Sequence, residues 1–152
     1  MKYLIVTLML MSNIWAYDVG DSLSEEMVSH LELKDDKVYV VDFFASWCGS
    51  CQKELPLMTK ANLNLNHDEV EIIGIDVDKD PQKAARFQEA LKAEGHLNFR
   101  VINDPQNLII AKFNPLGMPT LYYIKNKKVL KIITGAIDNI DQQIHNDLKM
   151  MR

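Results

Sequence analysis

Two cysteines, Cys48 and Cys51, are the residues of this chain best suited to chemistry, and they are its only cysteines. Two residues separate them, so a disulfide between them would close a very short loop. A structural disulfide stabilises a fold mainly by closing a long loop in the unfolded chain, so a stabilising role explains this pair poorly. The spacing favours reversible thiol–disulfide exchange, in which one thiol attacks a disulfide and the second resolves the product.

The position of Cys48 favours its thiolate. The residue lies where an expected strand gives way to an expected helix. At a helix N-terminus, unpaired backbone amides and the helix dipole stabilise negative charge. We therefore expect Cys48 to be the nucleophile. Cys51, nearly one turn further along the same helical face, is expected to be the resolving thiol.

Two carboxylates are candidates for proton transfer beside this pair. Asp42 interrupts an apolar strand that ends beneath the helix, and burial there would raise its pKa and suit it to accept the proton of Cys51. Its structural alternative is an anionic partner for the helix N-terminus. Glu54, one turn beyond Cys51, is a candidate proton relay, and its alternative is an ordinary solvated glutamate on the helix surface.

The pattern of apolar residues predicts the elements that must hold these side chains. The expected strands are 38–44, 70–77, 99–102, 121–124 and 129–134, with a polar turn between the last two. The expected helices are one capped by Ser24, one over 48–65, one from Pro81, one from Pro105 to Phe113 capped by Asp104, and one over 140–151 capped by Asp138. This order predicts an α/β fold with a mixed central sheet flanked by helices on both faces.

Composition indicates one ordinary globular domain. The 152 residues are 47% hydrophobic and 25% charged, which suits one compact core. With 17 Lys and Arg against 21 Asp and Glu, the formal charge is -4. Such a balance offers no basic surface for nucleic acid, so nucleic-acid binding is not expected.

The N-terminal residues have the pattern of a secretory signal. Lys2 precedes the apolar run 3–11, and a short polar stretch leads to Ala16. The run is too short for a transmembrane helix. We expect 1–16 to be a signal peptide, with an uncleaved membrane anchor as the alternative. Residues 17–152 would then form one domain exported to the periplasm.

The segment around the cysteines resembles the active-site segment of the thioredoxin superfamily. Residues 42–51 read DFFASWCGSC and Pro56 follows, while residues 117–120 read GMPT and resemble that family's cis-proline loop. The resemblance implies a thioredoxin-like fold and a cis bond before Pro119. The substrate-binding residues that it implies are Trp47, Met118, Pro119 and Thr120. The chain departs from thioredoxin itself between the cysteines, where Gly-Ser replaces Gly-Pro.

Two features narrow the resemblance to the exported TlpA/ResA-like group. Glu54 stands three residues after the second cysteine, and the segment 77–102 resembles that group's central insertion of a helix and a strand. Asp42, in contrast, matches thioredoxin, since an Asn is common there in the group. The resemblance implies a reductant of protein disulfides, with apocytochrome c as a candidate substrate and a membrane thiol carrier as electron donor. An oxidase or isomerase in oxidative protein folding is the alternative.

Metal binding and a purely binding module are the remaining alternatives. A closed zinc site needs four ligands, but the chain has no second cysteine pair. The four histidines are scattered without ligand spacing: His30, His67, His96 and His145. We therefore expect neither a metal nor another cofactor. A non-catalytic module on the same fold would need neither both thiols nor Asp42.

Overall fold

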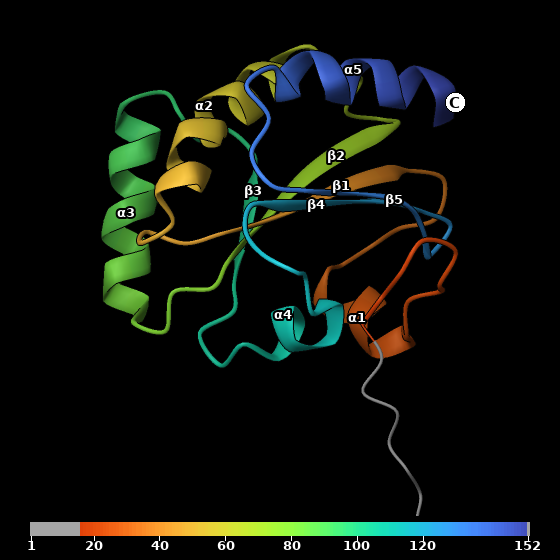
Figure 1. The fold of residues 1–152 in the computed structure, drawn as a ribbon, viewed down its shortest axis with the longest axis horizontal. Helices are drawn as coiled ribbons and strands as arrows, with labels where there is room; N and C mark the ends of the chain where they lie inside the picture. The colour runs from red at the N-terminus through yellow and green to blue at the C-terminus, as the bar shows by residue number, and fades with distance from the viewer. Residues whose placement is uncertain (1–15, 152) are drawn as a thin grey trace, which may run out of the picture.

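The computed structural model describes residues 16–151, which form a five-stranded sheet between layers of helices (Figure 1). The strands are β1 (Val38–Phe44), β2 (Val70–Asp76), β3 (Arg100–Asn103), β4 (Thr120–Lys125) and β5 (Lys128–Thr134). The helices are α1 (Glu25–His30), α2 (Gly49–Leu63), α3 (Pro81–Ala93), α4 (Leu108–Phe113) and α5 (Ile140–Met151). Almost all of the expected signal peptide lies outside the described residues.

The sheet is mixed, and its strand order is β3-β2-β1-β4-β5. The pairs β1–β2 and β2–β3 are parallel, whereas β4 runs antiparallel to both β1 and β5. Helices α2 and α5 cover one face, and α1 and α4 cover the other (Figure 1). The expected fold class is confirmed, and α3 with β3 forms the expected insertion. The central position of β1 places the following cysteine loop at the middle of the sheet's edge.

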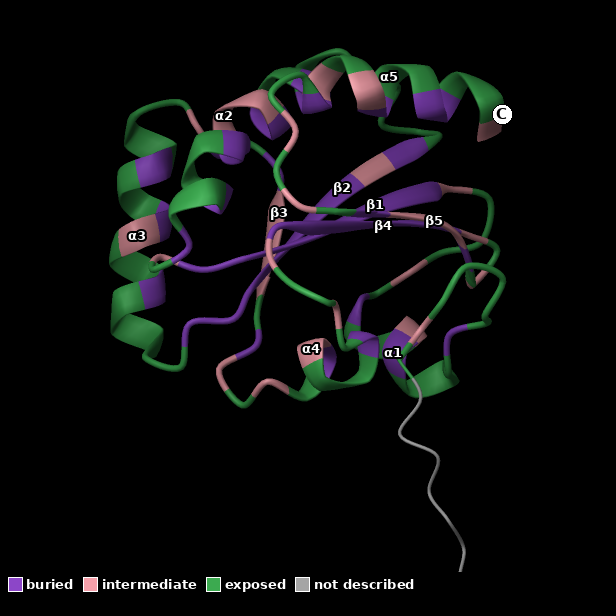
Figure 2. Cartoon of the chain, in the orientation of Figure 1, coloured by how far each residue is buried: buried purple, intermediate pink, exposed green. Residues whose placement is uncertain are grey.

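Strand β1 is the core of the molecule, because all seven of its residues are buried (Figure 2). Alternate side chains of a strand face opposite sides of a sheet. Phe43 packs against Phe113 of α4, with ring centroids 5.3 Å apart, and Phe44 packs against Phe87 of α3 at 6.2 Å. Asp42 shares the face of Phe44, and this face is the one that α2 and α5 cover (Figure 1).

Two helix starts differ from the sequence-based expectation. Helix α4 begins at Leu108, because the residues after Asp104 form a turn before the helix. Asp104 nevertheless caps it, since its buried carboxylate accepts the amide hydrogens of Leu108, Ile109 and Ile110 at 2.7–3.0 Å. Asp138 does not occupy the N-cap position of α5, because the helix begins at Ile140 and Asn139 precedes it, with Asp138 one residue earlier in the turn.

Helix α1 begins as expected, since the Ser24 hydroxyl accepts the amide hydrogen of Met27 at 3.3 Å. The expected hairpin is formed by β4 and β5, which Asn126 and Lys127 connect, both with positive φ. Two successive residues with positive φ are typical of the tight turns that match the twist of a hairpin. Over the described part of the chain, no helix is both long enough and apolar enough to span a bilayer.

Replacing Asp104 by Ala should lower the free energy of unfolding by about 2 kcal/mol, because three amides of α4 would lose a buried anionic acceptor. The matched control is Asp138→Ala at the start of α5, which should change that free energy by less than about 0.5 kcal/mol. Urea unfolding followed by circular dichroism measures both variants. Equal losses in the two variants would contradict the capping role of Asp104.

Candidate active site

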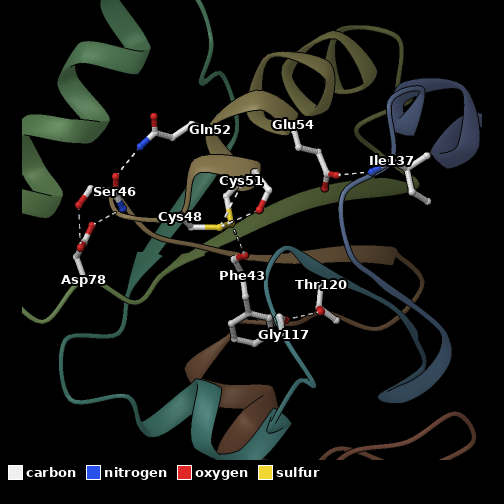
Figure 3. The surroundings of a disulfide bond; sticks show 11 residues. Phe43, Ser46, Cys48, Cys51, Gln52, Glu54, Asp78, Gly117, Thr120 and Ile137 are labelled. Atoms are coloured by element: carbon white, nitrogen blue, oxygen red, sulfur yellow. Dashed lines mark hydrogen bonds between the residues drawn. A yellow bond between two sulfur atoms is a disulfide. The ribbon is translucent and has the colours of Figure 1, made fainter.

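Cys48 and Cys51 form a disulfide at the N-terminus of α2 (Figure 3). Cys48 is the N-cap residue of the helix, and its Sγ accepts the amide hydrogen of Cys51 at 3.3 Å. Both cysteines are buried, with 7% of Cys48 and 1% of Cys51 exposed. Cys48 is therefore the more exposed residue of the pair.

Further polar groups lie close to both sulfurs. The Ser50 hydroxyl lies 3.6 Å from the Sγ of Cys48, and the bonded sulfur has no hydrogen, so the hydroxyl is the donor. The Sγ of Cys51 lies 3.9 Å from the backbone carbonyl oxygen of Phe43 (Figure 3). Ser50 was not among the predicted site residues, although a hydroxyl group between two cysteines can readily donate a hydrogen bond to a thiolate.

Asp78, which sequence reasoning missed, fixes the loop that leads to Cys48. Its buried carboxylate accepts the backbone N–H and the hydroxyl of Ser46 at 2.8 and 2.9 Å. The Gln52 side chain donates to the backbone oxygen of Ser46 at 2.5 Å (Figure 3). The amide of Asp78 in turn donates to the Asp76 carboxylate at 2.9 Å. In the sequence, the only sign of this role is the pair of aspartates at the end of β2, Asp76 and Asp78. Such a pair is equally typical of an ordinary loop.

Asp42 lies beneath the start of α2 and is 1% exposed. Its Oδ1 accepts no hydrogen bond from any of the described residues. Burial raises the pKa of Asp42 well above its ordinary value, and the nearby Glu54 carboxylate raises it further. This environment favours the neutral carboxyl group, which does not fit the alternative of an anionic partner for the helix N-terminus.

Glu54 is buried, so the alternative of a solvated surface glutamate is wrong. The residue is 3% exposed, and its Oε2 accepts the amide hydrogen of Ile137 at 3.1 Å (Figure 3). Burial raises the pKa of Glu54 to about 7, against the smaller lowering effect of that hydrogen bond. A carboxyl group with a pKa near neutrality is well matched to accepting and releasing protons at physiological pH.

The loop opposite the disulfide contains a cis Met118–Pro119 bond, the isomer that the resemblance implies. Met118 is half-buried and Pro119 is buried. Thr120 is fully buried, and its hydroxyl donates to the backbone oxygen of Gly117 at 2.7 Å (Figure 3). A fully buried side chain cannot touch a bound substrate. The Thr120 side chain instead stabilises the cis-proline loop through its hydrogen bond to Gly117.

A groove of about 510 Å³ lies beside Trp47, the residue that precedes Cys48 in the chain. Trp47, which is 62% exposed, and Met118 both contribute to its wall, so it joins the cysteine loop to the cis-proline loop. The other lining residues are Val77, Asp78, Lys79, Asp80, Lys83, Asn107 and Ile110. An open groove between the cysteine loop and the cis-proline loop has the form expected for binding an extended polypeptide.

The arrangement supports sulfur chemistry coupled to proton transfer. It holds a disulfide at a helix N-terminus, in which Cys48 is more exposed than Cys51, and two buried carboxyl groups with raised pKa values. In residues 16–151, no group of three or more His, Cys, Asp or Glu side chains is arranged to hold a metal ion.

Comparison with known proteins agrees with this arrangement. The sequence matches the AhpC/TSA family over residues 19–133. It is 27% identical to the thiol-disulfide oxidoreductase ResA of Geobacillus thermodenitrificans, over 86% of this chain and 77% of that protein. It is 30% identical to ResA of Bacillus thuringiensis subsp. konkukian, over 78% and 67% of the two chains. A Chlorobium tepidum structure described as thiol:disulfide interchange protein DsbE covers 89% of this chain and 98% of its own, with TM-score 0.73 and 23% identity. The ResA-like resemblance and the thioredoxin-like fold are thereby confirmed.

The raised pKa of Glu54 makes stability depend on pH. Folding raises this pKa from 4.5 to about 7, so between these values the folded state binds a proton that the unfolded state lacks. Stability should therefore fall as pH rises through this window. Between pH 5 and pH 8, the free energy of unfolding should fall by about 2.5 kcal/mol less in Glu54→Gln than in the unmodified protein.

Chemical denaturation at the two pH values measures this difference. The control is Glu89→Gln on the exposed surface of α3, which should follow the unmodified protein at both pH values. The same pH dependence in Glu54→Gln and in the unmodified protein would show that the carboxyl group of Glu54 is not desolvated.

Proposed function

The chain belongs to the AhpC/TSA family, and on that premise we propose that it is a thiol:disulfide oxidoreductase acting on protein disulfides through Cys48 and Cys51. The observation that carries the proposal is the disulfide at the N-terminus of α2, in which Cys48 is the more exposed of two buried cysteines. The relatives named thiol-disulfide oxidoreductase support the same activity.

In the proposed reaction, the reduced protein passes two electrons to its substrate. The Cys48 thiolate attacks one sulfur of a substrate disulfide, and the other substrate sulfur leaves as a thiolate, which takes up a proton. Cys51 then loses its proton to the buried carboxylates and attacks the Sγ of Cys48. This second attack releases the reduced substrate and leaves the Cys48–Cys51 disulfide. The proposed proton acceptor is whichever of Asp42 and Glu54 is ionised, because a raised pKa makes the ionised form of a carboxyl group a stronger base.

The groove lined by Trp47 and Met118 is the proposed substrate site. The exposed Trp47 ring and the Met118 side chain would contact the polypeptide on either side of its cysteine. The backbone at Pro119 lies in the same loop as Met118, so it would bind the extended substrate chain there. The apolar walls suit a flexible or partly unfolded segment, which exposes both its cysteine and apolar side chains.

The proposed direction is reduction, outside the cytoplasm. Residues 1–16 would direct export or anchor the protein, and the domain 17–152 would work in the periplasm. The resemblance to the ResA-like group supports apocytochrome c as a candidate substrate, in a role in cytochrome c biogenesis. A reductant in an oxidising compartment must be recharged, so a membrane thiol carrier is the proposed electron donor.

Replacing Cys48 by Ser should abolish the reduction of a model protein disulfide, because the attacking sulfur is lost. Replacing Cys51 by Ser should instead leave the first attack intact and trap a mixed disulfide with the substrate. Turnover assays and non-reducing gel electrophoresis measure the two outcomes. Full turnover by Cys48→Ser would reject the proposed function.

The potential of the Cys48–Cys51 pair distinguishes reduction from oxidation. If the protein is a reductant, equilibration with glutathione or dithiothreitol buffers should give a value near that of thioredoxin, about -270 mV. A value near about -120 mV, as in strongly oxidising proteins, would assign the oxidase alternative instead. Mass spectrometry after thiol alkylation counts the reduced and oxidised forms.

A further inference from the structure

We propose that Tyr123 and Asp147 form a proton relay that connects the sealed carboxyl groups beneath the disulfide to the surface at Lys131. The inference rests on the proposed function and names two residues that act in it without touching the sulfurs. The observation behind the inference is a row of buried polar side chains that lies between the sheet and the layer formed by α2 and α5.

The sealed carboxyl groups need such a path to reach protonation equilibrium with the solvent. Oxidation of the dithiol moves one proton from the Cys51 thiol to a carboxyl group beneath it, and recharging of the disulfide returns one proton to Cys51; between these steps the carboxyl groups adjust to the pH of the medium only through a path to water. Asp42 is 1% exposed, Glu54 is 3% exposed and Cys51 is 1% exposed, so water has little direct access to any of them. Proton transfer over several ångströms needs intervening groups that can both donate and accept a hydrogen bond.

Tyr123 is placed to be the first such group. It lies in β4 opposite Val40, so it shares the face of Asp42, two residues further along β1. Diagonal neighbours of this kind lie roughly 7–8 Å apart. Tyr123 is fully buried, and its hydroxyl has no hydrogen-bond partner among residues 16–151. Burial, then Asp147, then Glu54 raise the pKa of Tyr123, so both carboxylates act on this hydroxyl.

Asp147 of α5 continues the line toward the surface. The residue is fully buried, and its Oδ1 accepts hydrogen bonds from Lys131 at 2.6 Å and from Gln143 at 2.8 Å. Its Oδ2 has no hydrogen-bond partner in the described part of the chain. Lys131 lies opposite Tyr123 on β5, and its side chain is 33% exposed. The line therefore ends at a cation that water can reach.

The relay step is balanced and leaves Tyr123 unchanged. Protonated Glu54 gives its proton to the Tyr123 oxygen as the hydroxyl passes its own hydrogen to the Oδ2 of Asp147. Asp147 then releases a proton to water near Lys131, whose ammonium group restores the carboxylate as an ion pair. One proton leaves the site and no electrons move. Asp42 enters the same path through Glu54, the carboxylate that raises its pKa.

The chain offers a closely matched control for this inference. Tyr122 is the neighbouring residue, is also buried, and faces the opposite side of the sheet, where its hydroxyl donates to the backbone oxygen of Phe113 at 3.3 Å. Tyr123→Phe and Tyr122→Phe each remove a single hydroxyl group and keep the aromatic ring. Only the first lies on the proposed path.

Infrared spectroscopy of the oxidised protein tests the relay without an activity assay. After transfer from H₂O to D₂O at pH 6, the carbonyl band of the protonated carboxyl groups shifts as deuterium replaces hydrogen. The relay predicts that this shift is slower in Tyr123→Phe by about tenfold or more, and unchanged within about twofold in Tyr122→Phe. Equal exchange rates in Tyr123→Phe and the unmodified protein, with the fold intact by circular dichroism, would overturn the proposal.

Asp147→Asn provides a second variant, because it removes the receiving carboxylate and keeps the Tyr123 ring in place. It should slow the same exchange, and a normal rate in this variant would also overturn the relay. Disulfide reduction by the unmodified protein is measured in parallel. Absence of that activity would reject the proposed function, whereas normal activity with unchanged exchange in both variants would reject the relay alone.

Discussion

The desolvation of two carboxyl groups beneath the disulfide is the constraint on which the rest of the site depends. Asp42 extends from the central strand and Glu54 from the helix above it, and both are almost completely removed from water. Burying an ionised carboxylate is costly, so burial raises the pKa of Asp42 well above its ordinary value and that of Glu54 to about 7. The burial that lowers the stability of the fold therefore also provides a proton acceptor beside the sulfur of Cys51.

The fold supplies this arrangement through the position of β1. A strand at the centre of a five-stranded sheet is covered on both faces, so a polar residue within it is sealed from solvent. The same strand ends at the loop to Cys48, which Asp78 holds through the backbone and side chain of Ser46. In the chain, the inserted elements α3 and β3 come shortly after Asp78. Reactivity at the surface and proton binding inside thus depend on neighbouring segments of chain.

The sequence predicted the mixed sheet with helices on both faces, the helix starts at Ser24 and Pro81, and the cysteine site. These features depend on local patterns and short motifs. Glu54 was ambiguous because the amide that binds its carboxylate belongs to Ile137, which is 83 residues away in the chain. The start of α4 was predicted too early, since a carboxylate can cap a helix across an intervening turn. The partners of Tyr123 are set by the packing of α5 against the sheet, which no local pattern reveals.

Carbon-13 NMR titration of the side-chain carboxyl groups of Asp42 and Glu54 in the disulfide form tests the central claim most directly. The account predicts that Glu54 titrates near pH 7 and that Asp42 titrates well above 3.8. Titration of both groups at their ordinary values, 3.8 for Asp42 and 4.5 for Glu54, would show that they are hydrated and would contradict the account.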